Sequence, residues 1–167
     1  MEAIRQLRHE LGAENTLFVH LTLLPYLKAS NEVKTKPTQA SVRELRGIGI
    51  QPDIILARTD KQIDDDIRRK ISLFCDVDFE AVIPAYTADS IYEVPLMLQK
   101  FKLAQLVARK LNLGKISPRI KDWKDLNDKI KSKRKELKIA LVGKYTGLED
   151  AYISVIESLK ISCYHQN

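Results

Sequence analysis

The 167-residue sequence contains little cysteine and no long apolar run. Its two cysteines, Cys75 and Cys163, are too few for a disulfide framework, which indicates a reducing compartment. No apolar stretch approaches the roughly 20 residues of a membrane-spanning helix. Residues 1–5 begin an amphipathic helix and lack the apolar core of a signal peptide. The sequence therefore predicts a cytoplasmic protein without a membrane partner.

Excess basic charge is absent outside one span. Ten basic and four acidic residues lie between Lys115 and Lys138, and this span carries the whole net charge of +6. A nucleic-acid-binding surface usually interleaves basic residues with aromatic ones, whereas Trp123 alone interrupts this run. We therefore predict a solvated, partly helical linker over residues 114–137 and no nucleic-acid partner. A protein that associates with nucleic acid through residues 115–138 stays as an alternative.

Glycine is too sparse around the Gly143-Lys144 pair to form a phosphate-binding loop. Such a loop has a glycine five residues before its final glycine, and Ser or Thr after the lysine. The sequence has Lys138 and Tyr145 at these positions. Cys163 likewise lacks the flanking glycines of a tight nucleophile elbow. Neither feature therefore indicates a catalytic group.

What the sequence does contain is an alternation of short apolar runs with helical periods. The apolar runs at Thr16–Leu24, Asp53–Ala57 and Ala81–Ile83 are typical of strands. The first reads as buried on both faces, as strands of parallel sheets are. Helical spacing precedes the first run and follows each of the three. The alternation predicts an α/β fold, part of a doubly wound, mostly parallel sheet.

A second alternation follows the basic span. Ile139–Val142 is predicted as a strand, and Ala151, Val155 and Leu159 have the spacing of a helix after it. One strand–helix unit after a linker indicates the beginning of a second α/β domain. We therefore predict three parts: most of one domain, a linker and the start of a second domain, at residues 1–113, 114–137 and 138–167.

Three features have an ordinary structural interpretation. His20 lies inside an apolar run and is expected to be buried and hydrogen-bonded, with no catalytic partner nearby in sequence. The acids Asp64 to Asp66 are expected in the first turn of a helix, where negative charge suits the helix dipole, and less as a metal site. Ile67, Ile71 and Phe74 are predicted to form the buried stripe of that helix.

The segment Lys34–Gln39 places two ammonium groups, two hydroxyl groups and an amide within six residues. Pro37 disfavours the helical region for the residue before it, so an extended chain is expected to put Lys34 and Lys36 on one face. A helix capped by Thr38 or Ser41 should follow, and helix N-termini attract anions. This pattern suits a polyphosphate better than a lone carboxylate, and a solvated loop with two lysines is the ordinary alternative.

Arg58 directly follows the second predicted strand. It is expected at the carboxyl-end edge of the sheet, where ligands of open α/β folds bind. An arginine at this edge can stack on a base or pair with a phosphate. The alternative is a surface arginine that closes the strand.

The sequence resembles the CTP synthases, glutamine-dependent ligases that convert UTP to CTP. The resemblance covers nearly the whole chain and is weakest in the basic span and the last eight residues. It rests on motifs in the family's order, namely KTKPTQ at Lys34–Gln39, HLTLLP at His20–Pro25, SVRELRGIGIQPDIILAR at Ser41–Arg58, LFC at Leu73–Cys75, SIYEVP at Ser90–Pro95, and Ile139–Leu159 with its LVGKY core.

The resemblance implies a role for specific residues. UTP or the product CTP would be held by Lys34, Thr35, Lys36, Gln39, Lys70 and Phe74, the last bordering the site for inhibitory CTP. The ATP adenine would lie against Arg58, Thr87 and Ala88. Family members often carry an acidic residue where this chain has Thr87.

The resemblance also implies a reaction and its partners. Members use ATP to phosphorylate the 4-oxygen of UTP, and ammonia from glutamine displaces the phosphate; the UTP site forms between subunits of a tetramer. The resemblance makes this chain a central fragment: the rear of a P-loop-type synthetase domain, a linker and the start of the glutaminase domain. The P-loop, the carboxylates that hold Mg²⁺ and the glutaminase triad would lie outside it. It implies no catalytic residue and no metal ligand here, and no ligase activity from residues 1–167 alone. The alternative is a non-catalytic nucleotide-binding or assembly module.

Overall fold

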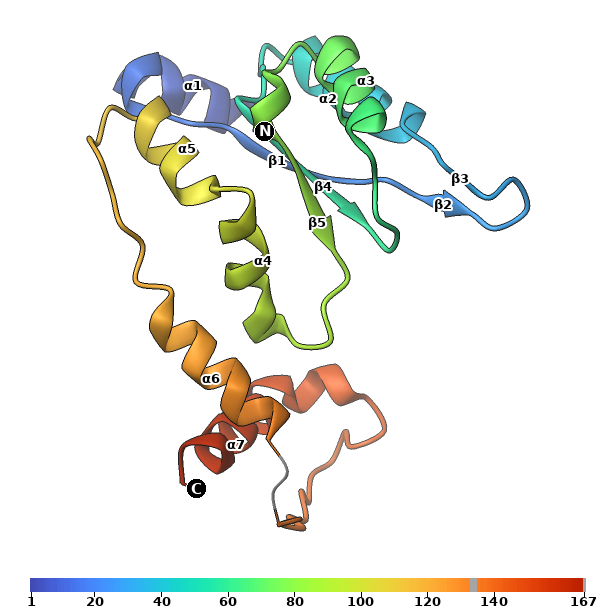
Figure 1. Cartoon of the computed structure of the whole chain (residues 1–167), viewed down its shortest axis with the longest axis vertical. Helices are drawn as coiled ribbons and strands as arrows, with labels where there is room; N and C mark the ends of the chain where they lie inside the picture. Colours follow the sequence, from blue (N-terminus) through green and yellow to red (C-terminus); the bar gives the residue numbers. More distant parts are fainter. Residues whose placement is uncertain (133–134, 167) are drawn as a thin grey trace. The chain divides into compact units, whose positions relative to one another are not determined.

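The computed structural model describes residues 1–132 and 135–166. Lys133 and Arg134 of the predicted linker, and Asn167 at the end of the predicted second domain, lie outside the described residues. The chain divides into two compact units, Met1–Ile120 and Lys121–Asn167 (Figure 1). The boundary between the units falls inside the span that the sequence predicts as a linker.

The first unit is built on a parallel sheet of three strands in the order β1-β4-β5. These strands are β1 (Val19–Leu23), β4 (Ile54–Thr59) and β5 (Val82–Tyr86). In the registers, Leu21 lies opposite Leu56, and Leu56 opposite Ile83. The predicted parallel α/β sheet is therefore confirmed, with each strand shifted by a few residues from the predicted run.

Helices cover both faces of the sheet because the central strand is apolar on both sides. Ile55 and Ala57 pack with residues of α2 (Lys36–Gly47) and α3 (Asp65–Cys75). On the opposite face, Ile54 packs with residues around α4 (Val94–Lys100) and α5 (Leu103–Lys110). Two separate apolar clusters thus form the core, as expected for a doubly wound fold.

The first strand differs from its prediction. β1 is an edge strand that pairs with β4 alone among the described strands. Leu21 and Leu23 are 64% and 61% exposed, whereas Thr22 between them is buried. The predicted burial of this strand on both faces is therefore wrong. A continuous apolar run indicates a strand but does not say whether neighbours cover both of its faces.

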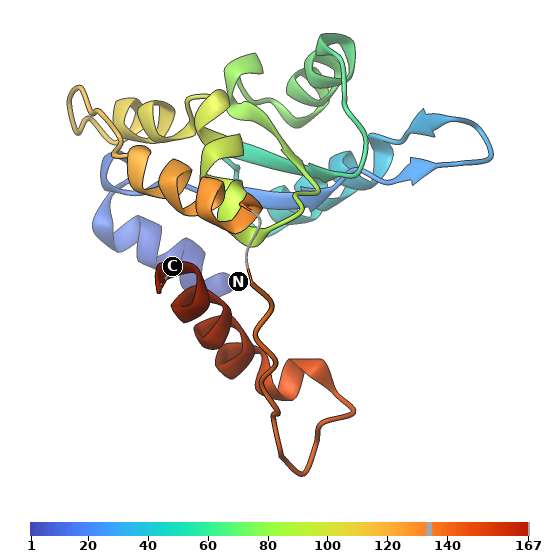
Figure 2. The ribbon, with the colours of Figure 1, turned by 60° about the horizontal axis from the view of Figure 1, so that its bottom comes forward.

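A small antiparallel hairpin follows β1. It consists of β2 (Tyr26–Leu27) and β3 (Glu32–Val33), and both views show it extending beyond the sheet (Figures 1 and 2). Asn31 takes a positive φ of 49° in the connecting turn, a conformation that asparagine tolerates. Strands of two residues are too short to show a period in the sequence.

The segment after the hairpin begins its helix earlier than predicted. α2 starts at Lys36 after Thr35, and Thr35 has φ −88° and ψ −17°. The chain is therefore not extended at Thr35, and the predicted extended run with Lys34 and Lys36 on one face is wrong. Pro37 is tolerated because the first helical residues need no N–H partner. Neither Thr38 nor Ser41 caps the helix; both lie within it.

The buried stripe of α3 also differs. Ile71 is fully buried, but Phe74 is 56% exposed, and Cys75 takes the buried position. Residues 67, 71 and 75 follow the four-residue spacing of one helix face, and Phe74 is rotated off it. Asp64, in contrast, precedes α3 as expected, and its side chain accepts a hydrogen bond from the Ile67 N–H at 2.8 Å. The helix-start interpretation of these acids is confirmed.

The remaining elements are short. The first unit also contains α1 (Glu2–Leu11), whose helix ends at Gly12 with a φ of 88°. The second unit contains α6 (Lys121–Lys131) and α7 (Ile153–His165). Single helical turns lie at Ala13–Asn15, Phe79–Ala81, Ile91–Glu93 and Glu149–Tyr152. Among the described residues, no helix is both long and apolar enough to cross a membrane.

The predicted strand at Ile139–Val142 does not form. A strand needs hydrogen-bond partners on a neighbour, and the described part of the unit Lys121–Asn167 holds no second strand. The helix expected to follow is present as α7. The predicted strand–helix unit of a second domain is thus observed in its helix and not in its strand.

Candidate functional site

A hollow of about 650 Å³ lies near the carboxyl ends of β1 and β4. It is formed by the hairpin, the start of α2, the loop after β4 and one side of α3. In open α/β sheets, ligands bind at this end of the strands. The residues that line it are Tyr26, Asn31, Glu32, Val33, Thr35, Lys61, Gln62, Ile67 and Lys70.

The start of α2 is fixed to the sheet by threonine hydroxyl groups. Thr38 Oγ1 donates to the Leu23 carbonyl oxygen at 3.1 Å and accepts from Thr22 Oγ1 at 3.3 Å. Thr35 is buried, and its Oγ1 accepts a hydrogen bond from Gln39 Nε2 at 3.0 Å. Thr35 therefore lines the hollow from a rigid helix start, with Gln39 one turn behind it.

Charges of both signs meet beside this helix start. Lys34 Nζ lies 2.5 Å from Glu32 Oε2, and both side chains are partly exposed. The hydrogen bond and the charge of Lys34 hold the pKa of Glu32 below its ordinary value, against a small opposing effect of burial. The charge of Lys70 on α3 lowers the pKa of Glu32 further. The field of both ammonium groups therefore reaches the carboxylate of Glu32.

The structure brings together some of the predicted nucleotide-binding residues and not others. Thr35 and Lys70 line the hollow directly, Lys34 joins them through Glu32, and Gln39 supports Thr35. Lys36 and Phe74 are exposed, and neither lines the hollow. Lys36 stands on the first helical position and Phe74 near the end of α3.

Of the nine residues that line the hollow, only Thr35 and Lys70 were predicted as site residues; Lys61 and Tyr26 are among those that were not. The Lys61 ammonium group lies over the Tyr26 ring, 5.2 Å from its centroid. Lys61 follows β4 by two residues, so the rule that singled out Arg58 applies to it too. Tyr26 gave no signal, because its position depends on a hairpin of two-residue strands.

The residues predicted to contact adenine form a second group at the carboxyl ends of β4 and β5. Arg58 Nη1 donates to Thr87 Oγ1 at 2.8 Å and lies 3.4 Å from Asp60 Oδ1. The Thr87 hydroxyl group also donates to Asp60 Oδ1. The Thr87 N–H bonds the Thr59 carbonyl oxygen at 3.2 Å, and the partly buried Ala88 follows. Arg58 and Thr87 are therefore in direct contact, although 29 residues separate them in sequence.

Acidic residues do not form a ligand set for a metal ion in the described part of the chain, where no group of three or more His, Cys, Asp or Glu side chains has a suitable arrangement. Asp65 and Asp66 instead pair with Arg68 and Arg69, one turn further along α3. These ion pairs and the capping bond of Asp64 account for the acidic triplet.

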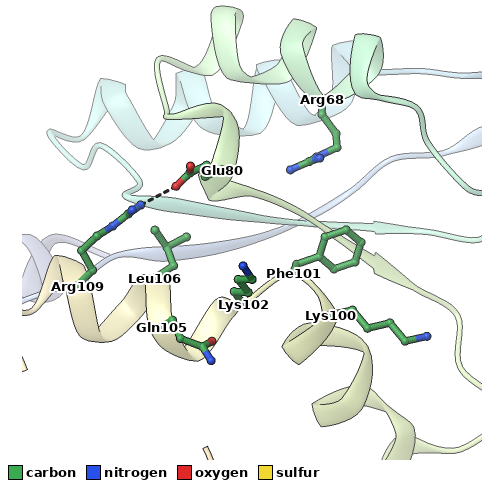
Figure 3. A pocket seen from close by; sticks show the side chains of 8 residues that line it. All are labelled: Arg68, Glu80, Lys100, Phe101, Lys102, Gln105, Leu106 and Arg109. Atoms are coloured by element: carbon green, nitrogen blue, oxygen red, sulfur yellow. Dashed lines mark hydrogen bonds and ion pairs between the residues drawn. The ribbon is translucent and has the colours of Figure 1, made fainter. Parts of the chain in front are cut away.

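A separate hollow of about 440 Å³ lies between the start of β5 and the α4–α5 corner (Figure 3). Two of its basic groups already have protein partners. Arg109 pairs with Glu80 at 2.8 Å, as the dashed line shows. Arg68 donates to the Val82 carbonyl oxygen at 3.1 Å and stacks over the Phe79 ring. None of the predicted site residues lines this hollow.

Two titratable groups outside these sites, His20 and Cys75, have pKa values shifted by burial. His20 is partly buried, its Nε2 lies 2.8 Å from Ser41 Oγ, and burial lowers its pKa. The expectation of a hydrogen-bonded histidine is confirmed, though the ring is only half-buried. Cys75 is fully buried, and burial raises the pKa of its thiol despite the opposing charge of Arg46. Such a thiol is a poor nucleophile.

The arrangement at the first hollow suits binding of an anion. Its ammonium groups offer donors, its threonine lies on a fixed helix start, and its apolar walls at Val33 and Ile67 can contact a flat organic group. Helix N-termini and lysines together are typical of phosphate sites.

The sequence of this chain matches one protein family and several curated relatives. The model of a family described as "CTP synthase N-terminus" matches residues 1–113. A CTP synthase from Roseiflexus castenholzii is 53% identical over 166 residues, which cover 99% of this chain and 30% of that protein. The one from Symbiobacterium thermophilum is 53% identical over 168 residues, covering 100% and 31%. The one from Methanocaldococcus jannaschii is 53% identical over 159 residues, covering 95% and 29%. The chain thus spans about 30% of the length of these curated relatives.

Proposed function

Since this chain belongs to the CTP synthase family, we propose that its first hollow is part of a site for UTP and for the product CTP. Lys34, Thr35, Lys36, Gln39, Lys70 and Phe74 are the residues proposed to hold the nucleotide. One observation carries the proposal: Thr35, at the start of α2, and Lys70 line the same hollow. Glu32 lines it too, and its carboxylate forms an ion pair with Lys34. Exposed Lys36 and Phe74 would reach the nucleotide from the rim.

The reaction we propose for the whole protein is the ATP-dependent amination of UTP to CTP with ammonia from glutamine, a step of pyrimidine biosynthesis. Transition-state stabilisation in phosphoryl transfer comes mainly from positioning and from metal-ion electrostatics. In this reaction the chain would position the substrate, because its hollow would orient the pyrimidine nucleotide. Arg58, Thr87 and Ala88 would contact ATP, and Mg²⁺ would be held by residues outside this chain.

We also propose a place for the chain within the whole enzyme. Residues 1–113 correspond to the rear of the synthetase domain, residues 114–137 to the linker and residues 138–167 to the start of the glutaminase domain. The enzyme would act as a cytoplasmic homotetramer, with the pyrimidine site between subunits. The 167 residues alone would form no CTP from UTP, ATP and ammonia. CTP detected by chromatography in that mixture would contradict this part of the proposal.

The binding proposal is tested by titrating the chain with UTP in a calorimeter. We expect saturable binding that is strongly weakened in Lys36→Ala. Lys36 is exposed on the first helical position, so the variant should fold, and circular dichroism checks this. Lys100→Ala removes the same charge from an exposed position that does not line the hollow. Equal affinities of the two variants and the unchanged chain would contradict the proposed role of Lys36.

A further inference from the structure

Lys61 is held at the edge of the first hollow by a buried threonine. Thr59, the last residue of β4, is 1% exposed. Its Oγ1 accepts a hydrogen bond from the Lys61 N–H and donates one to the Lys61 carbonyl oxygen, both at 3.3 Å. The backbone of Lys61 is thus bound on both sides to the end of the central strand. The direction in which its side chain leaves the sheet is therefore well defined.

The ammonium group of Lys61 faces an aromatic ring in place of a carboxylate. It lies 5.2 Å from the centroid of Tyr26, whose hydroxyl group donates to Asn31 across the hairpin. The adjacent acid, Asp60, is engaged by Arg58 and Thr87. Among the described residues, no carboxylate lies within ion-pair distance of Lys61. A ring face attracts a cation more weakly than an anion does at the same distance.

Glu32 supplies the negative charge of this hollow. Its carboxylate pairs with Lys34 and lies in the field of Lys70, and it lines the same hollow as Lys61. Two ammonium groups thus act on one carboxylate, and the third, that of Lys61, lines the same hollow. A triphosphate carries about four negative charges at neutral pH, since each phosphate group contributes one or more. The cations at the hollow fit such a group better than they fit a single carboxylate.

We propose that Lys61 is a third phosphate-binding lysine of the hollow, acting with Lys34 and Lys70 on the oligophosphate of a pyrimidine nucleoside triphosphate. Glu32 is the internal counter-ion that this oligophosphate displaces from Lys34. The inference rests on the proposed function. It adds Lys61 as a binding residue and Glu32 as a group that competes with the phosphates, and the two have opposite effects on the affinity. Removing Lys61 weakens binding, and neutralising Glu32 strengthens it.

The experiment is a calorimetric titration of the full 167-residue chain with UTP, with inorganic triphosphate and with uridine. We expect Lys61→Ala to weaken the binding of UTP and of triphosphate about tenfold each, the loss of one charge-assisted contact. Lys61→Arg keeps a cation and should stay within threefold of the unchanged chain. Glu32→Gln should bind both phosphate ligands several-fold more tightly. Lys100→Ala is the matched control, and any uridine binding should be equal in all variants.

The outcomes separate the inference from the function on which it rests. If the chain binds UTP but Lys61→Ala binds it equally well, the inference is overturned and the proposed function stands. An equal loss for uridine and UTP in Lys61→Ala would also overturn it, because the effect would not concern phosphate. If the unchanged chain binds neither UTP nor triphosphate, both are overturned. Lys61 and Glu32 are exposed, so their variants should fold, which circular dichroism verifies.

Discussion

Thr38 joins the first turn of α2 to the end of β1 through one buried hydroxyl group. It is fully buried, donates to the Leu23 carbonyl oxygen and accepts from Thr22 Oγ1. Thr38→Val keeps the shape of the side chain and removes the hydroxyl group. We expect this substitution to destabilise the unit Met1–Ile120 and to loosen the segment that lines the hollow.

The magnitude follows from the two lost hydrogen bonds. A neutral hydrogen bond contributes about 1 kcal/mol net, and a buried group left unpaired costs about 1–3 kcal/mol. Losing both bonds at this site should lower the free energy of unfolding by about 2 kcal/mol. Since 1.4 kcal/mol corresponds to a factor of ten, the equilibrium constant for opening should rise about 25-fold.

Hydrogen exchange measures this opening in the first unit without interference from the second. The amides of Ile55 and Ala57 lie in the central strand of the sheet and exchange only when it opens. We expect them to exchange about 25-fold faster in Thr38→Val and to change far less in Thr38→Ser, which keeps the hydroxyl group.

The double variant Thr22→Val with Thr38→Val adds a check on the coupling. It should lose less than the sum of the single variants, because the two hydroxyl groups share one hydrogen bond. Exchange rates in Thr38→Val within twofold of the unchanged chain would refute the reasoning.

Two further predictions concern titratable side chains. His20 should titrate below the value of about 6.5 for a free histidine, because burial lowers its pKa. Its contribution to stability is then complete above the unfolded pKa and is lost as the pH falls from there toward the folded pKa. His20→Gln should flatten this part of the stability curve, and an unchanged slope would contradict the burial effect. Cys75 should react with a thiol reagent more slowly than the partly buried Cys163, because Cys75 is fully buried and its thiol pKa is raised. Mass spectrometry of labelled peptides at pH 8 tests this, and equal rates in the folded chain would contradict it.

The sequence predicted the fold where a pattern depended on local chemistry. The apolar run before Arg58 became the central strand, because its residues are buried on both faces. Asp64 caps α3, where the sequence predicted acids at the start of a helix. A cap needs only its own neighbours in sequence, and an apolar run indicates a strand without fixing its place in the sheet.

The failures concern contacts between segments, which the periodicity within one segment does not show. The exposure of Leu21 follows from the edge position of β1, which only the strand order decides. The hairpin is set by the pairing of Tyr26 with Val33 and by the bond from the Lys34 N–H to the Pro25 carbonyl oxygen. No strand at 139–142 forms, because strands require partners.

The candidate site was predicted in part for the same reason. Thr35 and Lys70 line one hollow, as the resemblance implied they could. The contact between Arg58 and Thr87 joins the ends of two strands that are adjacent in the sheet. Lys61 was not predicted as a site residue, because its place in the hollow involves a contact with Tyr26, and the hairpin determines the position of Tyr26. The roles of all these residues in binding stay predictions.

The free side of β1 has a consequence for handling the protein. Its outer N–H and C=O groups have no strand partner among the described residues, and the exposed side chains of Val19, Leu21 and Leu23 flank them. In edge strands, a lysine, a proline or a bulge normally prevents pairing with the strands of other chains. The strand VHLTL contains neither lysine nor proline. The colloidal behaviour of the purified chain should therefore be governed by these five residues, with turbidity rising steeply with concentration. Leu21→Lys, which places a charge on the exposed face, should raise the concentration at which turbidity appears.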